Sequence, residues 1–424
     1  MIFPVAWVVA GTLIMLVRQA GVPSYDTLWA EDGERFLRDA LAEPIESIFS
    51  LYAGYLHLPP RLIAAAAGAG SLENAAAIFA AASALVVALV SLYVFVASES
   101  AVASPWLRAA LAGSVLLIPA GAYETANNAT NLHWYLTYGC FWALLDRSVS
   151  RHRQVGAGAV SFAATLSNPM AGLLFPLAVW ELVKRPSARE RIPLFVYLAG
   201  LSVQAGFVLW GTSQTGLGDE TGLLVAYGET DWSEIPRLYG LGVTATLLVG
   251  EQFLADVWDL LGWDVWYLAG LVFLLLAVAV AVKHPDRRIR VLGPVAFLLS
   301  VLFFALPVGV RGTAVINAPP PDATLLGSRY VMLSMLFLLT LLVLAVDGLA
   351  SARRTRILPI VFSGALLISF AFTFRVHNAR SDGPSWSRGV QEAERSCRSD
   401  GREAQIPHSP SGWSLDVGCN SLTR

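Results

Sequence analysis

The sequence is short of charge and of cysteine. Charged residues make up only 14 % of its 424 residues, whereas a soluble domain carries about 25 %. Hydrophobic residues reach 55 %. A soluble globule could not bury that much apolar surface, so we expect much of the chain to lie in lipid. Three cysteines are too few for a secreted disulfide-rich scaffold.

Other absences narrow the classes of function. The net charge is −2, so there is no basic field that would attract nucleic acid. Six histidines are scattered along the chain, and no pair has the spacing of metal ligands. We therefore predict neither a metal site nor another cofactor, and leave open only Mg²⁺ or Mn²⁺ on the acidic pair described below. No tandem repeat is visible, which disfavours transporter folds built from repeats.

Long apolar runs are what the sequence has in abundance. A helix that crosses a bilayer needs about 20 largely apolar residues. A further apolar stretch, 155–183, is broken by Ser167-Asn168-Pro169, so it predicts two short helices that meet near the outer face. We therefore expect an all-α polytopic membrane protein with about eleven transmembrane helices. The nine uninterrupted runs are 2–19, 74–97, 105–120, 132–146, 190–210, 264–282, 291–310, 330–349 and 357–374.

The orientation follows from the basic residues in the short loops. Four loops are rich in Arg or Lys, and all four fall on one side in this count of spans. Positive charge in short loops marks the cytoplasmic side, so we expect the N-terminus inside and the C-terminus outside. The four loops are Arg147–Arg153, Lys184–Arg191, Lys283–Arg290 and Arg353–Arg356.

The polar C-terminal tail differs from the rest of the chain. We divide the sequence into a transmembrane module, 1–374, and a small extracytoplasmic tail, 375–424. Cys397 and Cys419 both lie in this tail, where an oxidising compartment would preserve a disulfide. We predict that they form a bridge, which would stabilise the tail by about 3 kcal/mol in the chain-entropy model.

The first outer loop, 20–73, carries the strongest functional signal. The adjacent acids Glu31 and Asp32 follow Trp29 and precede an amphipathic stretch that predicts a helix lying on the bilayer surface. Carboxylates at the first turn of a helix are held ionised and fixed in place, which a general base requires. The simpler interpretation is a helix cap with solvated charge. A second surface helix is expected at 59–69, after Pro59 and Pro60.

Further polar and aromatic residues would gather with this pair at the outer surface. Aromatic faces bind sugar C–H groups, and arginine binds phosphate, so we expect a sugar site beside a phosphate site. The alternatives are an aromatic belt and arginines that anchor lipid headgroups. The candidate sugar-binding and acceptor-binding residues are Trp29, Tyr55, His57, Glu124, Asn128, Asn131, His133 and Trp134. The candidate phosphate-binding residues are Arg329, Arg311 and Arg61.

Two segments carry a resemblance to a known family. Trp29-Ala30-Glu31-Asp32-Gly33, with Phe36-Leu37-Arg38, resembles the Asp-Asp-Gly acidic motif of actinobacterial arabinofuranosyltransferases. His57-Leu58-Pro59-Pro60-Arg61-Leu62 is similar to the Pro-Pro turn of protein mannosyltransferase and aminoarabinose transferase relatives, apart from an inserted Leu58 and Arg61 in place of Leu. Residues 1–98 thus resemble the start of a GT-C (type A) membrane glycosyltransferase.

The resemblance implies an enzyme of a bacterial plasma membrane. Its donor would be a polyprenyl-phosphate sugar, its acceptor an extracytoplasmic glycan or glycolipid, and its transfer inverting. Membrane lipids would be its other partners, and we expect a monomer. One carboxylate would serve as general base. We slightly favour Asp32, which completes the Asp-Gly element, and either Asp32 or Glu31 could serve.

Three alternatives stay open. A transporter or polyprenyl-lipid flippase would place charges inside its spans, whereas here the polar chemistry gathers on the outer side. An O-antigen polymerase or ligase would carry a large outer loop in the second half of the chain, whereas here the distinctive acids follow the first span. In a non-catalytic scaffold, the first-loop carboxylates would be replaceable.

Overall fold

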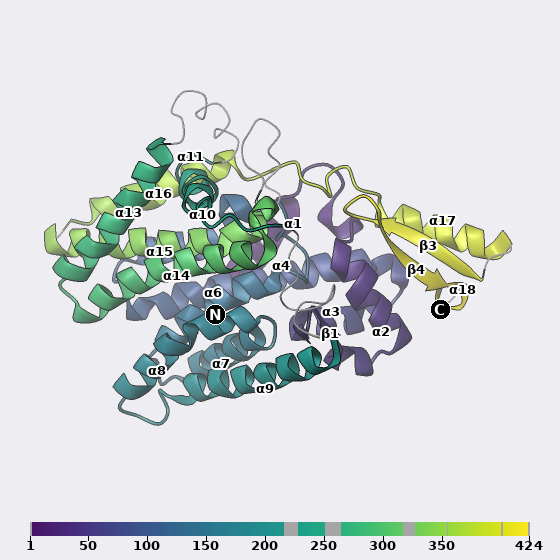
Figure 1. Ribbon diagram of the computed structural model, residues 1–424, viewed down its shortest axis with the longest axis horizontal. Coiled ribbons are helices and arrows are strands. Elements are labelled where there is room, and N and C mark those ends of the chain that lie inside the picture. The colour runs from purple at the N-terminus through teal and green to yellow at the C-terminus, as the bar shows by residue number, and fades with distance from the viewer. Residues whose placement is uncertain are drawn as a thin grey trace.

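The chain forms an elongated bundle of helices with a small extension at one end (Figure 1). The computed structural model describes residues 2–215, 228–250, 264–316, 327–353, 355–399 and 402–422. In these residues the helices of the body are α1 (Ile2–Val17), α2 (Arg38–Ala42), α3 (Leu58–Gly68), α4 (Ala75–Ala97), α5 (Pro105–Leu117), α6 (Leu132–Leu145), α7 (Arg151–Thr165), α8 (Phe175–Lys184), α9 (Ile192–Thr215), α10 (Ile235–Tyr239), α11 (Thr246–Val249), α13 (Asp264–Lys283), α14 (Arg287–Arg311), α15 (Ser328–Arg353) and α16 (Ile357–Phe372).

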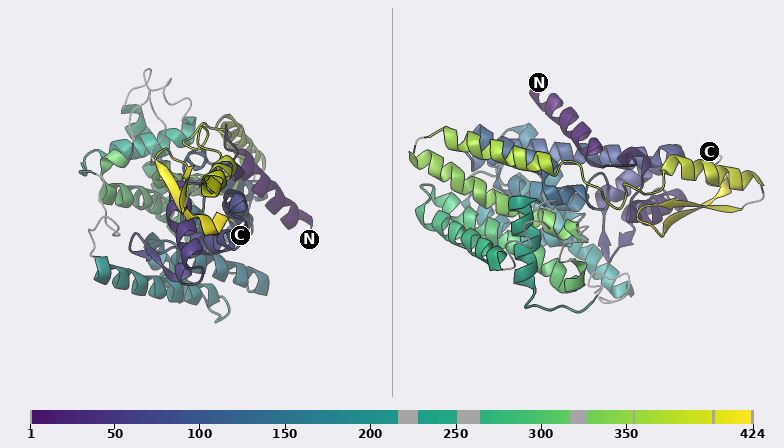
Figure 2. Two further views of the ribbon diagram at one scale, coloured as in Figure 1. Left: turned by 90° about the vertical axis from the view of Figure 1, so that its right-hand side faces the viewer. Right: turned by 90° about the horizontal axis from the view of Figure 1, so that it is seen from above.

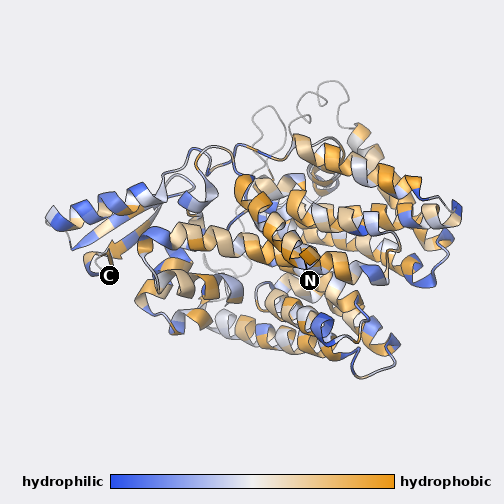
Figure 3. Cartoon of the chain, turned by 180° about the vertical axis from the view of Figure 1, so that it is seen from behind, coloured by the Kyte–Doolittle hydropathy of each residue, from blue (hydrophilic) through white to orange (hydrophobic). Residues whose placement is uncertain are grey.

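Several of these helices are long and apolar enough to cross a membrane. Among the described residues five qualify by length and composition, and three shorter helices are also apolar. The chain is therefore a multi-pass membrane protein, as its composition predicts. Figure 3 shows the apolar residues spread over the body, whereas hydrophilic residues dominate the extension. The five long segments are Leu72–Ser100, Pro105–Ala122, Ile192–Ser213, Arg287–Arg311 and Ser328–Arg353.

Helices α6 and α15 form the centre of the bundle. Every residue of α6 is buried, and α15 is buried along most of its length. Their side chains meet directly: the Tyr138 and Thr340 hydroxyls are 2.9 Å apart, and the Phe141 and Phe337 rings pack edge to face. A helix that is apolar on all sides belongs in such a core. By contrast, the outer face of α1 is exposed, and Figure 2 shows its N-terminal end standing clear of the body.

The interrupted apolar stretch 155–183 forms two helices, as the sequence predicts. Helix α7 ends at Thr165 and α8 begins at Phe175, with a 3₁₀ turn, Pro169–Leu174, between them. The Asn168 side chain accepts a hydrogen bond from the Met170 N–H at 2.9 Å, which caps that turn. The Leu166 carbonyl accepts one from the Leu58 N–H at 3.0 Å. The break thus lies against the first outer loop.

The opposite end of the bundle is joined by one buried carboxylate. Glu181 is fully buried and pairs with Arg147 at 3.0 Å, Arg288 at 3.1 Å and Arg185 at 3.3 Å. A buried carboxylate is stable only when its oxygens are paired in this way. Each arginine comes from a different predicted basic loop, so these three loops lie at the same end of the bundle, as the expected orientation requires.

The first outer loop contains more structure than two helices. A π-helical turn, Asp32–Leu37, leads into the short α2, and the second predicted helix is confirmed as α3. Between them lies a hairpin that the sequence reading does not include, β1 (Leu51–Tyr52) paired with β2 (Tyr55–Leu56). Its two central residues, Ala53 and Gly54, have φ of 51° and 76°, the left-handed conformation of a tight two-residue hairpin turn.

The tail adds a two-stranded hairpin to a chain that is otherwise mainly helical, as the expected all-α class requires. It contains α17 (Trp386–Ser399), α18 (Cys419–Leu422) and an antiparallel hairpin of β3 (Glu403–His408) with β4 (Trp413–Gly418). Along β3, buried residues alternate with exposed ones, so one face of the hairpin packs against α17. The predicted disulfide between Cys397 and Cys419 is confirmed, and the free Cys140 is buried in α6.

The disulfide should stabilise the tail measurably. Replacing both cysteines of the bridge with serine releases a closed loop spanning 22 residues of sequence separation, which should cost about 3 kcal/mol. Amide hydrogen exchange in β3 and β4 should then rise by about a hundredfold. A C140S variant is the matched control and should exchange as the wild type does. Equal exchange in all three proteins would contradict this role of the bridge.

Candidate functional site

The carboxylate of Asp32 holds a turn that lies almost a hundred residues further along the chain. Its side chain is 1 % exposed. Oδ2 accepts the Ala129 N–H at 2.9 Å, and Oδ1 accepts both the Thr130 N–H at 2.9 Å and the Thr130 hydroxyl at 2.6 Å. Three donors occupy the two oxygens, so Asp32 anchors the segment that precedes α6.

Burial also changes the acidity of this group. Removal from water raises the pKa of Asp32 to about 6, and the nearby Glu31 charge adds to that rise. The hydrogen bonds from Ala129 and Thr130 favour the ionised form and offset part of it. At neutral pH the group is therefore largely ionised and fully engaged.

The same turn is gripped from its other side by a residue of the tail. Arg380 is fully buried and donates to the carbonyls of Ala126 and Asn127. The Asn127 side chain donates to the Met15 carbonyl at 2.7 Å, which ties the turn to the end of α1. The sequence reading did not nominate Arg380, because nothing in the local pattern of the tail pairs it with residues some 250 positions earlier.

Glu31 is in a different situation from its neighbour. Its side chain is half-buried, and its Oε2 is buried with no hydrogen-bond partner among the described residues. Its charge interacts with the Tyr55 phenol and with the Arg329 guanidinium. Buried carboxylate oxygens are rarely left without a donor, so Glu31 is the acid of the pair that has capacity to accept a proton or a hydrogen bond.

Arg329 is brought to the same place by the loop before α6. The Glu124 carboxylate accepts the Arg329 backbone N–H at 3.2 Å and the Ser328 hydroxyl at 3.4 Å, which fixes the start of α15. The Arg329 guanidinium lies 5.1 Å from the centre of the Tyr330 ring. Arg311 also acts electrostatically on Tyr55. Both arginines thus act electrostatically on Tyr55 of β2.

An aromatic group lines this side of the first loop. The Tyr55 ring stacks on His57 at 4.1 Å, and the rings of His57 and His133 lie 6.4 Å apart. His57 Nε2 bonds to the Tyr52 carbonyl at 3.1 Å, whereas Nδ1 has no partner among the described residues. Burial holds the pKa of His57 well below its usual value, so the ring is neutral at pH 7. Trp134 packs edge to face on Tyr330.

Four residues nominated from the sequence share one property. Each carries a buried polar atom with no hydrogen-bond partner among the described residues. Further buried polar atoms without a partner lie elsewhere among the described residues, Trp142 Nε1 and Ser161 Oγ among them, and polar ligands commonly satisfy those found in binding sites. The four atoms are Trp29 Nε1, Glu31 Oε2, His57 Nδ1 and Trp134 Nε1.

Other nominated residues are committed to holding the fold. Arg61 is buried, pairs with Asp39 at 2.7 Å and donates to the Ser50 carbonyl at 3.1 Å. Its guanidinium therefore stabilises the first loop. The Asn128 side-chain oxygen Oδ1 accepts the Asn131 N–H at 3.0 Å, and the Asn131 side chain donates to the Glu124 backbone carbonyl at 3.1 Å. These two asparagines shape the turn that presents Glu124.

The described part of the chain contains no group of three or more His, Cys, Asp or Glu side chains arranged to hold a metal ion.

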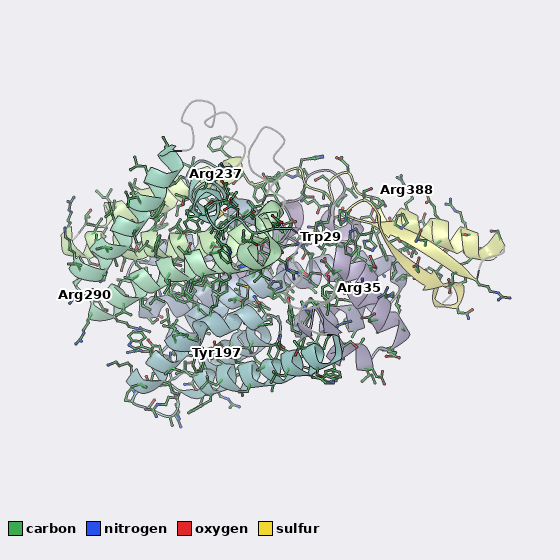
Figure 4. The ribbon with its side chains drawn as sticks, in the orientation of Figure 1. Trp29, Arg35, Tyr197, Arg237, Arg290 and Arg388 are labelled. Carbon is green, nitrogen blue, oxygen red and sulfur yellow. A yellow bond between two sulfur atoms is a disulfide. The ribbon has the colours of Figure 1, made fainter. Side chains whose placement is uncertain are left out.

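No protein-family model matches the sequence, and neither a curated protein nor a solved structure matches it. We therefore infer the function from the sequence motifs and from the geometry of the residues around Glu31. Figure 4 shows Trp29, two residues before Glu31, near the middle of the molecule, between the long helices and the C-terminal extension.

The raised pKa of Asp32 predicts a pH-dependent stability. An acid whose pKa rises on folding binds its proton more tightly in the native state, so ionisation destabilises the fold. The free energy of unfolding should fall by about 3 kcal/mol in total between about pH 3 and pH 7, most steeply between the unfolded and folded pKa values, and then stay level. Thermal unfolding in detergent across this range measures the slope.

The D32N variant should lose this slope. It should also be less stable at pH 4, because the Asn amide places a donor against a backbone N–H. The control E43Q, an exposed acid in the same loop, should keep the full slope. An unchanged slope in D32N would show that Asp32 does not titrate in this range.

Proposed function

We propose that this protein is an inverting membrane glycosyltransferase. It transfers a sugar from polyprenyl phosphate to an extracytoplasmic glycan or glycolipid. The proposed topology has about eleven spans in a bacterial plasma membrane, with a cytoplasmic N-terminus and an extracytoplasmic C-terminus. The observation that carries the proposal is the Glu31 carboxylate, whose Oε2 has no hydrogen-bond partner among the described residues. Its charge interacts with that of Arg329, and it lies two residues after Trp29 in the acidic motif.

In the proposed reaction Glu31 is the general base. The acceptor hydroxyl gives its proton to the Glu31 carboxylate as its oxygen attacks C1 of the donor sugar. The bond between C1 and the phosphate oxygen breaks, and its electron pair leaves with the polyprenyl phosphate. A single displacement of this kind inverts the configuration at C1. Only one working carboxylate is needed, because the phosphate leaves without a proton.

This assignment differs from the slight preference for Asp32 that the motif gives. All three hydrogen bonds to Asp32 come from Ala129 and Thr130, and its removal from that turn would leave their backbone donors unpaired. Glu31 Oε2 holds no such donors among the described residues. In the proposal Asp32 positions the turn, and Glu31 meets the substrate.

The arginines stabilise the leaving group. Negative charge develops on the phosphate as the C1–O bond breaks, and a cation already in place stabilises it without reorganisation. Arg329 is the principal candidate because its position is fixed through Glu124 and Tyr330, and Arg311 is the second. The indole N–H groups of Trp29 and Trp134 supply donors for sugar hydroxyls.

The two acids can be separated by mutation. In E31Q we expect turnover to fall by at least a hundredfold, since the base is lost, with little change in thermal stability. In D32N we expect a loss of stability together with any loss of turnover. The assay follows transfer from a polyprenyl-phosphate sugar in detergent. E34Q, one helical turn further on, is the control and should retain activity. Full turnover in E31Q would refute the base assignment.

Arg329 should act mainly on the donor. R329Q should lower kcat/KM for the polyprenyl-phosphate sugar by about 10²–10³ through loss of charge at the leaving group. The affinity for acceptor should change little. R353Q, at the other end of α15, removes an exposed arginine and should behave as the wild type. If R329Q affects only the KM of the acceptor, Arg329 does not bind the donor phosphate.

A further inference from the structure

The segment between α16 and α17 packs against the end of the bundle that carries the first outer loop. We define residues 376–385 as the tail strap. Val376 forms a parallel bridge with Gln19, and the Ser381 carbonyl accepts the Val22 N–H at 2.9 Å. Asn378 donates to the Ala122 carbonyl at 3.0 Å. The strap therefore contacts both the start of the first outer loop and the segment that precedes α6.

Arg380 is the residue of the strap that reaches both parts of the candidate site. On one side its guanidinium donates to the carbonyls of Ala126 and Asn127. On the other side it lies 5.7 Å from the centre of the Trp29 ring, and its charge interacts with that of Asp32. One buried cation thus contacts the turn 126–130 and the segment that carries Glu31.

Asp32 and Arg380 bind complementary backbone groups of the turn 126–130. Asp32 takes the amide hydrogens of Ala129 and Thr130, while Arg380 takes the carbonyls of the two residues before Asn128. Asp32 belongs to the first outer loop, and Arg380 belongs to the tail. Opposite charges on the two sides lower the cost of burying each of them.

The segment that carries Glu31 has a second contact with the tail. Ser409 forms a parallel bridge with Trp29. Its N–H donates to the Leu28 carbonyl at 3.1 Å, and its carbonyl accepts the Ala30 N–H. The tail thereby fixes the backbone immediately before Glu31. Arg380 lies against the side chain of Trp29, which stands between Leu28 and Ala30 in the sequence.

We propose that Arg380 is a positioning residue for the Glu31 site, and that the tail is consequently part of the catalytic unit. The proposal rests on the proposed function. Arg380 holds Trp29 and the turn 126–130 at a fixed separation. This separation sets the distance between the Glu31 carboxylate and the Arg329 guanidinium. A displacement of about 1 Å in such a site can lower turnover by about a hundredfold.

The charge of Arg380 survives its burial. Removal from water lowers its pKa to about 10, and the Asp32 carboxylate opposes that change. The guanidinium therefore stays protonated at neutral pH. A lysine at this position would keep the charge and one carbonyl contact, whereas a glutamine would keep a donor and lose the charge.

The test compares R380Q and R380K with a matched control, R185Q, in the full-length protein. Arg185 is equally buried and also donates to backbone carbonyls, those of Leu144 and Glu190, at the opposite end of the bundle. We expect R380Q to lower kcat by ten- to a hundredfold with little change in donor KM, and R380K to recover most of that loss. R185Q should lower the thermal midpoint without lowering kcat per folded molecule.

A purely structural role gives a different result. If R380Q lowers the thermal midpoint as R185Q does and leaves kcat per folded molecule unchanged, the positioning role is overturned. An equal loss in R380K and R380Q would overturn the contribution of the charge.

A second readout does not depend on transfer activity. If the wild type transfers no sugar, the proposed function fails, and amide hydrogen exchange then decides the role of Arg380. We expect exchange in peptides covering 126–131 to rise at least tenfold in R380Q and to stay at the wild-type rate in R185Q. No difference between the two variants in these peptides would overturn the inference.

Discussion

The Asp32 carboxylate, buried under the turn that contains Ala129 and Thr130, is the contact on which the outer end of the molecule depends. A carboxylate can lose its water only when donors replace it, and here three hydrogen bonds do so. The contact joins the first outer loop to the segment that enters α6. Because α6 is buried on every side, its entry point is fixed relative to the core, and so is the first loop.

This contact also separates the roles of two neighbouring acids. Asp32 is buried and accepts three hydrogen bonds, while the preceding residue, Glu31, keeps an oxygen without a partner among the described residues. Two neighbouring carboxylates can take different roles in one site when their environments differ. In the proposed enzyme Asp32 fixes the geometry of the site, and Glu31 accepts the proton. The arginines divide in the same way: Arg61 pairs with Asp39 in the fold, and Arg329 interacts electrostatically with Glu31.

Local sequence signals predicted the elements that local physics controls. Pro169 broke the apolar stretch where α7 and α8 separate, Pro59 and Pro60 marked the start of α3, and the cysteines of the tail formed their bridge. The hairpin between β1 and β2 was not foreseen, because its turn contains Ala53 at positive φ instead of the usual Asn or Asp.

Long-range contacts could not be predicted from one sequence. The motif favoured Asp32, and nothing near it in the chain signals that residues 129 and 130 would occupy its oxygens. Arg380 was not nominated, since its partners lie some 250 residues earlier. The sequence did gather Glu31, His57, Trp134 and Arg329 as candidates, because acids, rings and arginines at span ends are rare unless they have partners.

The central claim is that Glu31, and not Asp32, meets the reacting sugar. A structure of the protein in a lipid nanodisc with a non-transferable phosphonate analogue of a polyprenyl-phosphate sugar tests it most directly. The account predicts the phosphonate within hydrogen-bonding distance of Arg329, the anomeric carbon facing the Glu31 carboxylate, and Asp32 still bonded to Ala129 and Thr130. An analogue bound away from Glu31, or an Asp32 carboxylate turned from its turn toward the sugar, would contradict it.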